Sequence, residues 1–248
     1  ELAQEQKRME ALLEELNEAS RIARLASYEI KPQTQTILFN NRFFDLLGID
    51  VSTPSSFEMP ISQAIERFIH PEDAPRLRYD LGTIGTAGMT GDLEYRLQHT
   101  DGTIRTFLFR FVVELDENDT PISVKGAVQD ITERKQAEEQ LRKFQLALER
   151  STDAVFMTNN EGLIEYVNPA FEKTYGFAAQ EVIGENPRLI KSGVIPPEQY
   201  VHFWKALLND EVVAGELINK RKDGRFIPVE AMNASILDIN GHRLGFMA

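Results

Sequence analysis

The chain of 248 residues contains no cysteine. This absence excludes disulfide bonds, thiolate metal sites, a cysteine nucleophile and any chromophore attached through a thioether. The sequence also has no apolar run of about 18 residues, the length that a membrane-spanning helix needs, and no signal-peptide pattern. We therefore expect a cytoplasmic chain that makes no membrane contact. Its first residue is Glu1 rather than Met, which indicates a fragment of a longer protein.

Positive charge is also scarce. Lys and Arg number 27 against 39 Asp and Glu, so the net charge is −12 and the isoelectric point is about 4.9. Nucleic acids and anionic lipid surfaces bind basic faces, so neither is an expected partner. The sequence has none of the short motifs of nucleophilic, phosphate-binding, zinc-dependent or dinucleotide-binding enzymes. We expect no enzymatic activity from this chain. We also expect no metal site, because no His pair lies at metal-ligand spacing from a carboxylate.

Two segments predict amphipathic helices. Residues 1–26 are rich in Glu, Gln, Leu and Ala and contain no Gly or Pro. Their apolar seam, at alternating spacings of three and four, consists of Met9, Leu12, Leu16, Ala19, Ala23 and Ala26. This spacing fits either a coiled coil or a helix packed on its own domain. Residues 134–150 have a similar seam and predict a connecting helix, which can transmit displacement between two domains. The seam of this second helix consists of Ala137, Leu141, Phe144 and Leu148.

The segments that follow the two helices resemble each other. Residues 39–48 and 167–176 share an Asn in the second position and a Gly in the last, at an offset of 128 residues. Residues 100–103 and 222–225 each contain an Asp-Gly hairpin turn, at an offset of 122 residues. A near-constant offset over this length indicates two copies of one domain. We assign the copies to residues 27–133 and 151–248.

Each copy has the same order of expected elements: two short strands, small helices, one longer helix and three longer strands. The expected strands are 27–31, 36–39, 92–99, 104–115 and 122–130 in the first copy, and 154–158, 163–167, 213–221, 226–237 and 242–248 in the second. The longer helices are expected at about 72–87 and 197–209. This order predicts an α+β fold, in which each copy forms a five-stranded antiparallel sheet with helices on one face.

The two copies resemble a pair of PAS domains. Residues 128–135 (Val-Gln-Asp-Ile-Thr-Glu-Arg-Lys) resemble the motif that closes the domain and continues into an exit helix. Residues 69–73 (Ile-His-Pro-Glu-Asp) resemble the start of the central helix in one PAS subtype. Residues 168–171, 184–188 and 219–224 resemble the most typical bacterial form. The resemblance covers residues 20–248, and residues 1–19 and 134–150 resemble the signalling helices that join such domains.

The resemblance implies a sensory module of a bacterial signalling protein. PAS domains fold around a pocket that holds flavin, haem, a small metabolite or nothing. They usually dimerise and control a separate output domain, typically a histidine kinase or a cyclic-di-GMP cyclase. We therefore expect a homodimer formed through the helices, and an output domain in the same polypeptide. The second copy ends at Ala248 before an Asp-Ile-Thr equivalent, so its exit helix and the output domain are expected beyond this fragment.

The second copy resembles, more narrowly, the flavin-binding redox sensors among PAS domains. Residues 191–230 align without a gap with such sensors, which place Trp and Asn at the positions of Trp204 and Asn219. A flavin ring needs an aromatic wall and polar groups for its pyrimidine edge, and these two residues can supply one of each. Asn168 and Asn186, from the motif segments, complete our set of candidate FAD-binding residues.

Other interpretations of the pocket stay open. Many PAS domains that bind no flavin have the same Trp, and a buried Trp is usually part of the core. Pro187 and Phe156 stand where the flavin pattern has polar residues. Pro187 also occupies the position of the cysteine that forms a flavin adduct in light-sensing PAS domains, so that photochemistry is excluded. Haem needs an axial His, and His202 lies on the appropriate helix.

The remaining interpretation is a dimerisation and relay module in which side chains fill both pockets. The first copy fits this interpretation better, because Phe107, Phe109 and Phe111 recur at period two on one strand and can plug a pocket. In either case, the resemblance makes Asp130 and Thr132 the signalling junction, where the last strand becomes the exit helix. Their short polar side chains are also typical of a helix N-cap.

Overall fold

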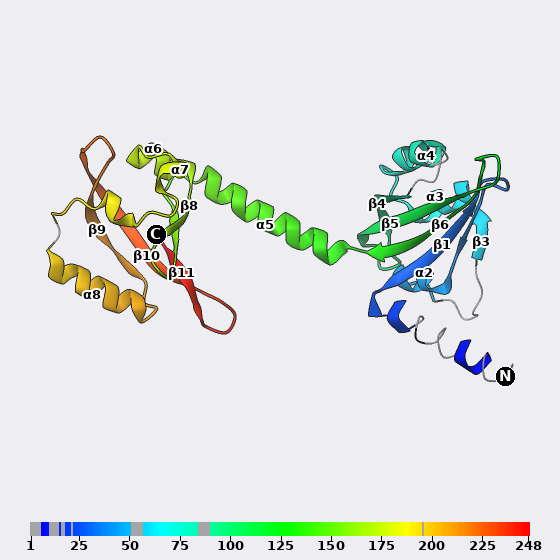
Figure 1. The fold of residues 1–248 in the computed structure, drawn as a ribbon, viewed down its shortest axis with the longest axis horizontal. Coiled ribbons are helices and arrows are strands. Elements are labelled where there is room, and N and C mark those ends of the chain that lie inside the picture. The colour runs from blue at the N-terminus through cyan, green and yellow to red at the C-terminus, as the bar shows by residue number, and fades with distance from the viewer. Residues whose placement is uncertain are drawn as a thin grey trace. The chain divides into compact units, whose positions relative to one another are not determined.

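The computed structural model describes residues 6–9, 15, 18–20, 22–50, 57–83, 90–194 and 196–248. The chain divides into two compact units, Glu1–Glu139 and Gln140–Ala248, which we call the first and second domains (Figure 1). Each domain is an antiparallel sheet with helices, so the predicted α+β class is confirmed. No helix in the described part of the chain is long and apolar enough to cross a membrane.

The sheet of the first domain has six strands, one more than predicted. The strands are β1 (Leu25–Lys31), β2 (Thr36–Phe39), β3 (Phe57–Pro60), β4 (Thr90–Gln98), β5 (Ile104–Leu115) and β6 (Pro121–Asp130), in the spatial order β3-β2-β1-β6-β5-β4. The additional strand is β3, which pairs with β2 at the edge of the sheet. The pairing of β3 depends on a segment some 20 residues earlier in the chain, which the local pattern of its four residues does not show.

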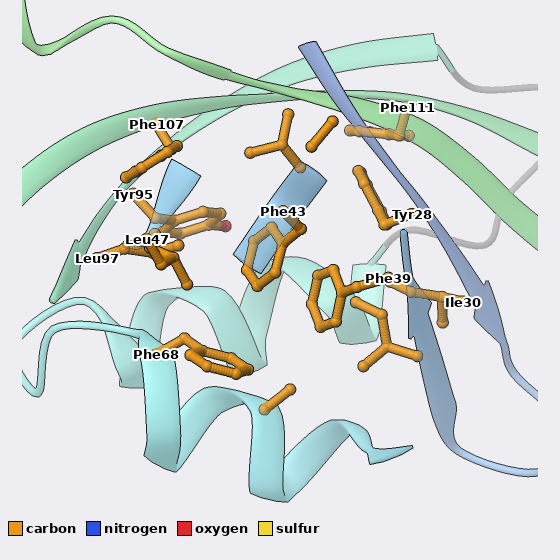
Figure 2. Close-up of a cluster of buried hydrophobic side chains, with 14 of the residues drawn as sticks. Tyr28, Ile30, Phe39, Phe43, Leu47, Phe68, Tyr95, Leu97, Phe107 and Phe111 are labelled. Atoms are coloured by element: carbon orange, nitrogen blue, oxygen red, sulfur yellow. The ribbon is translucent and has the colours of Figure 1, made fainter. Parts of the chain in front are cut away.

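The helices of the first domain, α2 (Asn41–Leu46), α3 (Ile61–Phe68) and α4 (Ala74–Thr83), contribute to a core that is rich in aromatic rings. Phe39 of β2 stacks on Phe43 of α2, with ring centroids 3.8 Å apart, and Phe68 of α3 meets both rings edge to face. Figure 2 shows these side chains pointing from the sheet and the helices toward one another. The aromatic core therefore holds the helices on one face of the sheet.

The first helix ends earlier than predicted. Residues 6–9, 15, 18–20 and 22 are helical, but β1 begins at Leu25, and Ala26 of the predicted seam is buried in that strand. Arg24 adopts a left-handed conformation with φ of 50°, which ends a helix. Leu12 and Leu16 of the seam lie outside the described residues.

The connecting helix α5 (Thr132–Arg150) begins two residues before the predicted start at residue 134. The earlier start reflects the hydrogen bonds of Asp130 and Thr132 described below. None of the 19 residues of α5, all of which the structure describes, is buried. Its apolar seam is therefore exposed, with Leu141 at 61% and Phe144 at 67% of their full accessible surface.

The sheet of the second domain has the five strands that were predicted. They are β7 (Phe156–Asn159), β8 (Ile164–Val167), β9 (Val213–Lys220), β10 (Phe226–Leu237) and β11 (Arg243–Met247), in the spatial order β8-β7-β11-β10-β9. The helices are α6 (Pro169–Tyr175), α7 (Ala179–Val182), the 3-10 helix η1 (Pro187–Ile190) and α8 (Pro197–Leu208). Gly176 ends α6 with φ of 78°, a conformation that favours glycine.

The pairing registers confirm that the domains are copies. Leu97 pairs with Arg105 in the first domain, and Asn219 pairs with Ile227 in the second, at an offset of 122 residues for both members. The isolated bridges Ile69–Leu97 and Lys191–Asn219 keep the same offset. Residues of the two sheets can therefore be compared position by position.

Candidate functional site

The inner face of each sheet is the face that packs against the helices. In the second domain, the Ser235 hydroxyl of β10 donates a hydrogen bond to the carbonyl oxygen of Leu207 in α8, at 2.9 Å. Ile227 packs against the core cluster that includes residues of α6. Because side chains alternate along a strand, every second residue of β10 from Ile227 to Ser235 lies on this face. Residues paired directly across antiparallel strands share a face as well.

Equivalent inner-face positions carry very different side chains in the two domains. Phe107, Phe109 and Phe111 of β5 correspond to Val229, Ala231 and Asn233 of β10. At the other compared positions, Tyr95 corresponds to Leu217, Leu97 to Asn219, Val113 to Ser235, and Ile30 to Thr158. At these positions the second domain has smaller or more polar side chains, whereas Phe246 of β11 takes the place of the smaller Val124 of β6.

This difference leaves the inner face filled in the first domain and open in the second. Phe107, Phe111 and Tyr95 are buried in the first domain (Figure 2). The apolar cavity that remains there measures about 60 Å³. None of the residues of β9 and β10, all of which the structure describes, is buried. The part of the inner face that β9 and β10 form is therefore not sealed by the domain's own side chains, and we call the space in front of it the chamber.

The second domain also has a surface groove, which none of the four predicted cofactor-binding residues lines. A groove of about 490 Å³ lies between α6 and the start of β10, and the inner-face residues Ile227 and Val229 form part of its wall. Its other lining residues are Thr152, Ala170, Lys173, Thr174, Arg221 and Pro228. A ligand pocket of ordinary size has a volume of about 300–1,000 Å³.

Trp204, the predicted aromatic wall, lies on α8 and is 43% exposed. Its ring meets the rings of Phe203 and Phe246 edge to face, at centroid distances of 5.5 and 5.7 Å. Phe246 of β11 pairs with Ser235, which places it on the inner face. Trp204 therefore borders the chamber and is not fully covered by the core.

Asn219, the predicted polar partner of a flavin, lies on the inner face of β9. Its Nδ2 atom donates a hydrogen bond to the hydroxyl oxygen of Tyr175 in α6, at 2.9 Å. Burial raises the pKa of Tyr175, so this hydroxyl stays protonated near neutral pH. The structure places Asn219 and Trp204 on the borders of one chamber, against different elements.

Asn168 and Asn186 form hydrogen bonds to the backbone that stabilise the fold. Asn168 is fully buried, and its Oδ1 atom accepts hydrogen bonds from the backbone amides of Val155 and Phe171 at 2.9 Å. Its Nδ2 atom donates to the carbonyl oxygens of Leu148 and Asp153, at 3.0 and 2.8 Å. The protein thus uses every hydrogen-bonding position of this amide, and none is left for a cofactor.

Asn186 caps the 3-10 helix η1. Its Oδ1 atom accepts a hydrogen bond from the backbone amide of Arg188 at 3.0 Å, and its Nδ2 atom donates to the carbonyl oxygen of Gly162 at 3.1 Å. The predicted cofactor role of Asn186 has no support from this geometry, which ties a loop to η1.

Thr158 of β7 was not predicted as a site residue. It is 5% exposed, and its Oγ1 atom is buried without a hydrogen-bond partner. A buried polar atom is normally paired, so this one is unusual. The sequence contains no local signal for it, because Thr is common in strands. Only the register, which aligns Thr158 with the apolar Ile30, distinguishes it.

Asp130 and Thr132 lie together at the start of α5, as predicted for the junction. Asp130 Oδ1 accepts hydrogen bonds from the backbone amide and the hydroxyl of Thr132, at 2.9 and 2.5 Å. The Thr132 hydroxyl oxygen in turn accepts from the backbone amide of Thr106 in β5, at 3.0 Å. Arg105 Nη1 lies 3.7 Å from Asp130 Oδ2. These contacts connect the start of α5 to two strands, while the signalling role of the pair stays a prediction.

The candidate haem ligand, His202, lies on α8 and is exposed on the surface of the second domain. Among the described residues, no group of three or more His, Cys, Asp or Glu side chains is arranged to hold a metal ion.

Comparisons with known proteins agree with the geometry. A PAS-fold family model matches residues 142–248, and a second PAS-fold model matches residues 36–128. A nitrogen fixation regulatory protein of Klebsiella oxytoca is 31% identical over 105 residues, which are 42% of this chain and 21% of that protein. The sensor protein FixL of Bradyrhizobium diazoefficiens is 22% identical over 213 residues, which are 83% of this chain and 41% of that protein.

Among solved structures, a sensory box histidine kinase/response regulator from Burkholderia thailandensis is 23% identical, with a TM-score of 0.46, and covers 55% of this chain and 98% of that one. This chain spans less than half the length of the two curated relatives. The two family models together match most of the sequence, and each covers most of the strands of one sheet. The chain therefore belongs to the PAS family and consists of two PAS domains in tandem.

Proposed function

We propose that this tandem PAS chain, a sensory input module of a signalling protein, detects redox state or a small planar ligand through its second domain. FAD is the ligand we favour. The first domain serves dimerisation and signal relay without a bound ligand. The relatives, a regulatory protein and a sensor protein, support a role in sensing.

One observation carries the proposal: the inner face of the second sheet lacks the three phenylalanine rings that fill the equivalent place in the first domain. Where the first domain has Phe107, Phe109 and Phe111, the second has Val229, Ala231 and Asn233. Apolar surface left in contact with water costs about 25 cal/mol per Å², so an uncovered inner face is maintained only at a cost in stability. A ligand that covers this face would offset that cost.

The residues around the chamber fit a flavin. Trp204 offers an aromatic surface that is only partly covered, and Asn219, Asn233 and Ser235 offer polar groups along the inner face. The unpartnered hydroxyl of Thr158 is a further polar group that nothing in the protein satisfies. When bound, FAD would supply reversible oxidation and reduction. These aromatic and polar side chains would hold and orient the cofactor.

The signal would leave each sheet through the helix that follows it. In the first domain the contacts of Thr132 with Asp130 and Thr106 link β5 and β6 to α5. A shift in the sheet would change these hydrogen bonds and bias α5 between two packings. We propose a homodimer through α5, and a kinase or cyclic-di-GMP cyclase output in the same polypeptide, all in the cytoplasm.

The alternative is a pair of domains that both lack a ligand. The first domain favours it, since its inner face is filled and its cavity of about 60 Å³ is too small for a flavin. The same alternative applied to the second domain leaves the open chamber unexplained. Haem has less support, because His202 is exposed.

The first test is an absorption spectrum of the purified chain from roughly 300 to 700 nm, where flavin and haem absorb. The chain is then stripped of any bound ligand and titrated with FAD. Ala231→Phe places an aromatic ring of the first domain into the chamber, and we expect it to abolish FAD binding. Met232→Phe is the matched control, because its side chain is on the opposite face and 66% exposed, and we expect unchanged binding.

FAD binding by Ala231→Phe at wild-type affinity, in a variant with an unchanged circular dichroism spectrum, would contradict the chamber as the site. Trp204→Ala and Asn219→Ala test the two residues chosen from the sequence. Each is expected to lose bound flavin, and retention of flavin by both would remove their assignment while leaving the chamber in place.

A further inference from the structure

The outer face of the second sheet, opposite the helices, differs in chemistry from the outer face of the first sheet. We propose that this outer face is a docking surface for the helix that follows β11 in the same polypeptide, held through basic residues in the first turn of that helix. We call the surface around Glu216, Glu230 and Met232 the docking face. The inference rests on the proposed function, in which the signal leaves the second sheet through this helix, and it is independent of the ligand.

The first observation is a pair of uncovered carboxylates. Glu216 of β9 pairs directly with Glu230 of β10, and both residues are exposed. Among the described residues, neither carboxylate has a hydrogen-bond or ion-pair partner. Like charges placed directly opposite each other on one face of a sheet are destabilising. Cations from another segment would relieve this repulsion.

The second observation is that the first domain covers the equivalent position with its own exit helix. Glu94 of β4 corresponds to Glu216, at the offset of 122 residues. Arg134 Nη2 and Lys135 Nζ, in the first turn of α5, lie 3.8 and 2.7 Å from the carboxylate oxygens of Glu94. Leu108, the outer-face residue that pairs with Glu94, is buried. A helix that follows a closing strand therefore reaches this part of the outer face.

The third observation is an apolar surface one step further along the strands. In the first domain the next pair of outer-face residues is Asp92 and Arg110, which form an ion pair at 3.3 Å. The equivalent pair in the second domain is Ala214 and Met232, and Met232 is 66% exposed. A helix that continued over this pair would remove the methionine side chain from water, whereas the ion pair of the first domain gains nothing from being covered.

The neighbouring strands show a second exchange of the same kind. Lys125 Nζ of β6 lies 2.8 Å from Glu114 Oε2 of β5. The equivalent residues of the second domain are Met247 and Ile236. The docking face therefore combines apolar side chains with two uncovered carboxylates, and an amphipathic helix with basic residues matches both.

The sheet itself indicates that the occupant belongs to the same polypeptide. β6 pairs with β5 along Phe107–Leu115, whereas β11 pairs with β10 only along Ala234–Leu237. Ile131, which follows β6, is buried and donates its amide hydrogen to the carbonyl oxygen of Thr106. Pro228, the equivalent of Thr106, lines the surface groove of about 490 Å³. An extension of β11 would lie in this groove and bring the helix to the docking face.

The test extends the chain after Ala248 with a copy of Ala127–Arg150. This copy continues the pairing register of β11, because Met247 pairs with β10 as Lys125 pairs with β5. The copy supplies a strand end, an apolar residue and a basic first turn, which is the chemistry that the docking face requires.

Crosslinking measures the docking directly. The chain has no cysteine, so two introduced cysteines form a unique pair for a short bismaleimide crosslinker. Glu216→Cys provides one cysteine, and the other replaces the appended copy of Lys135. We expect an intramolecular crosslink, detected by mass spectrometry. Glu161→Cys, in the exposed turn between β7 and β8, is the matched control in place of Glu216→Cys and should give no crosslink.

Charge reversal tests the ion pairs, with the melting temperature of the second domain followed by the fluorescence of Trp204, the single tryptophan. In the extended chain, Glu216→Lys with Glu230→Lys should lower this temperature by about 4 °C, because the new cations would face the appended copies of Arg134 and Lys135. Replacing those two copies by Glu should restore it. In the chain without the extension, the same two substitutions should leave it unchanged, because one like-charged pair replaces another.

An extended chain without the intramolecular crosslink, or a melting temperature that the exchanged charges do not restore, would overturn the docking face and leave ligand binding by the second domain untouched. A crosslink that forms only between two chains would also overturn it, because a second copy would then be the occupant. A chain that takes up no FAD but forms the intramolecular crosslink would remove the proposed ligand and support the docking face.

Discussion

Asn168 shows how much a single amide can hold together. It receives two backbone N–H groups and donates to two backbone carbonyls, which come from the end of α5, the following loop and α6. The side chain has no exposed surface. Its place in a motif made it a candidate for cofactor binding, but its four hydrogen bonds make it a structural centre of the second domain.

Replacing Asn168 by Ala should lower the free energy of unfolding of the second domain by about 3 kcal/mol, since four buried backbone groups lose their partner. Asn186→Ala, which removes two hydrogen bonds at a half-buried cap, should cost about 1 kcal/mol. Urea unfolding followed by tryptophan fluorescence measures both, because Trp204 is the single tryptophan and reports on the second domain. An equal loss of unfolding free energy in the two variants would show that the buried network of Asn168 stabilises the domain no more than the cap of Asn186 does.

At the scale of elements, one ion pair attaches helix α4 to strand β4 in the first domain. Asp73, the residue before α4, accepts hydrogen bonds from the backbone amide of Arg96 and from its guanidinium, at 2.8 and 2.7 Å. These hydrogen bonds lower the pKa of Asp73, and its side chain is only 14% exposed. A carboxylate whose pKa is lower in the folded protein stabilises the fold above its unfolded pKa of about 3.9.

This attachment predicts a pH-dependent stability difference. Asp73→Asn should destabilise the first domain at pH 7, and the difference from the wild type should shrink as the pH falls below about 4, because Asp73 is protonated first in the unfolded state and, at lower pH, in the folded state. Asp92→Asn, at an exposed carboxylate that meets Arg110, is the control and should show a small difference. Melting temperatures by circular dichroism across this range provide the measurement. A difference for Asp73→Asn that is independent of pH would contradict the argument.

At the scale of the whole molecule, α5 presents an apolar seam that its own chain leaves uncovered. Leu141 and Phe144 are largely exposed and Leu148 is half-buried, at the spacings of a coiled-coil seam. Exposed apolar stripes of this kind mark an interaction surface. A second copy of the chain presents the same stripe, so in the proposed homodimer a symmetric pair of α5 helices would cover both.

A double substitution of Leu141 and Leu148 by Lys should therefore convert a dimer into a monomer, because two charges per chain would be brought into the seam. Sedimentation equilibrium gives the mass directly. Glu139→Lys, which changes a charge on the other side of the helix, should leave the dimer intact. Unchanged dimerisation in the double variant would remove α5 as the dimer interface, and with it the proposed route of the signal.

Several elements of the fold follow from local patterns. Strands β5 and β10 lie at the predicted spans, because alternation of side chains and the Asp-Gly turns before both strands are properties of neighbouring residues. Strand β3 and the end of the first helix were missed. The first depends on pairing between Phe39 and Phe57, and the second on a left-handed Arg24. Neither leaves a strong signal in the order of residues.

The repeat, the α+β class and the PAS resemblance were legible in the linear order of residues, because spacing and turn chemistry encode them. The hydrogen bonds that each buried polar side chain makes could not be predicted from that order. Asn168 directly follows strand β8 and Thr158 lies in strand β7. Both are short polar residues, yet the amide of Asn168 has all its hydrogen bonds and the hydroxyl of Thr158 has none. The hydrogen-bond partners of a buried polar group come from segments far apart in the chain. The surroundings of a side chain on the inner face depend on the pairing register of neighbouring strands. Both are therefore set by the folded arrangement of the backbone.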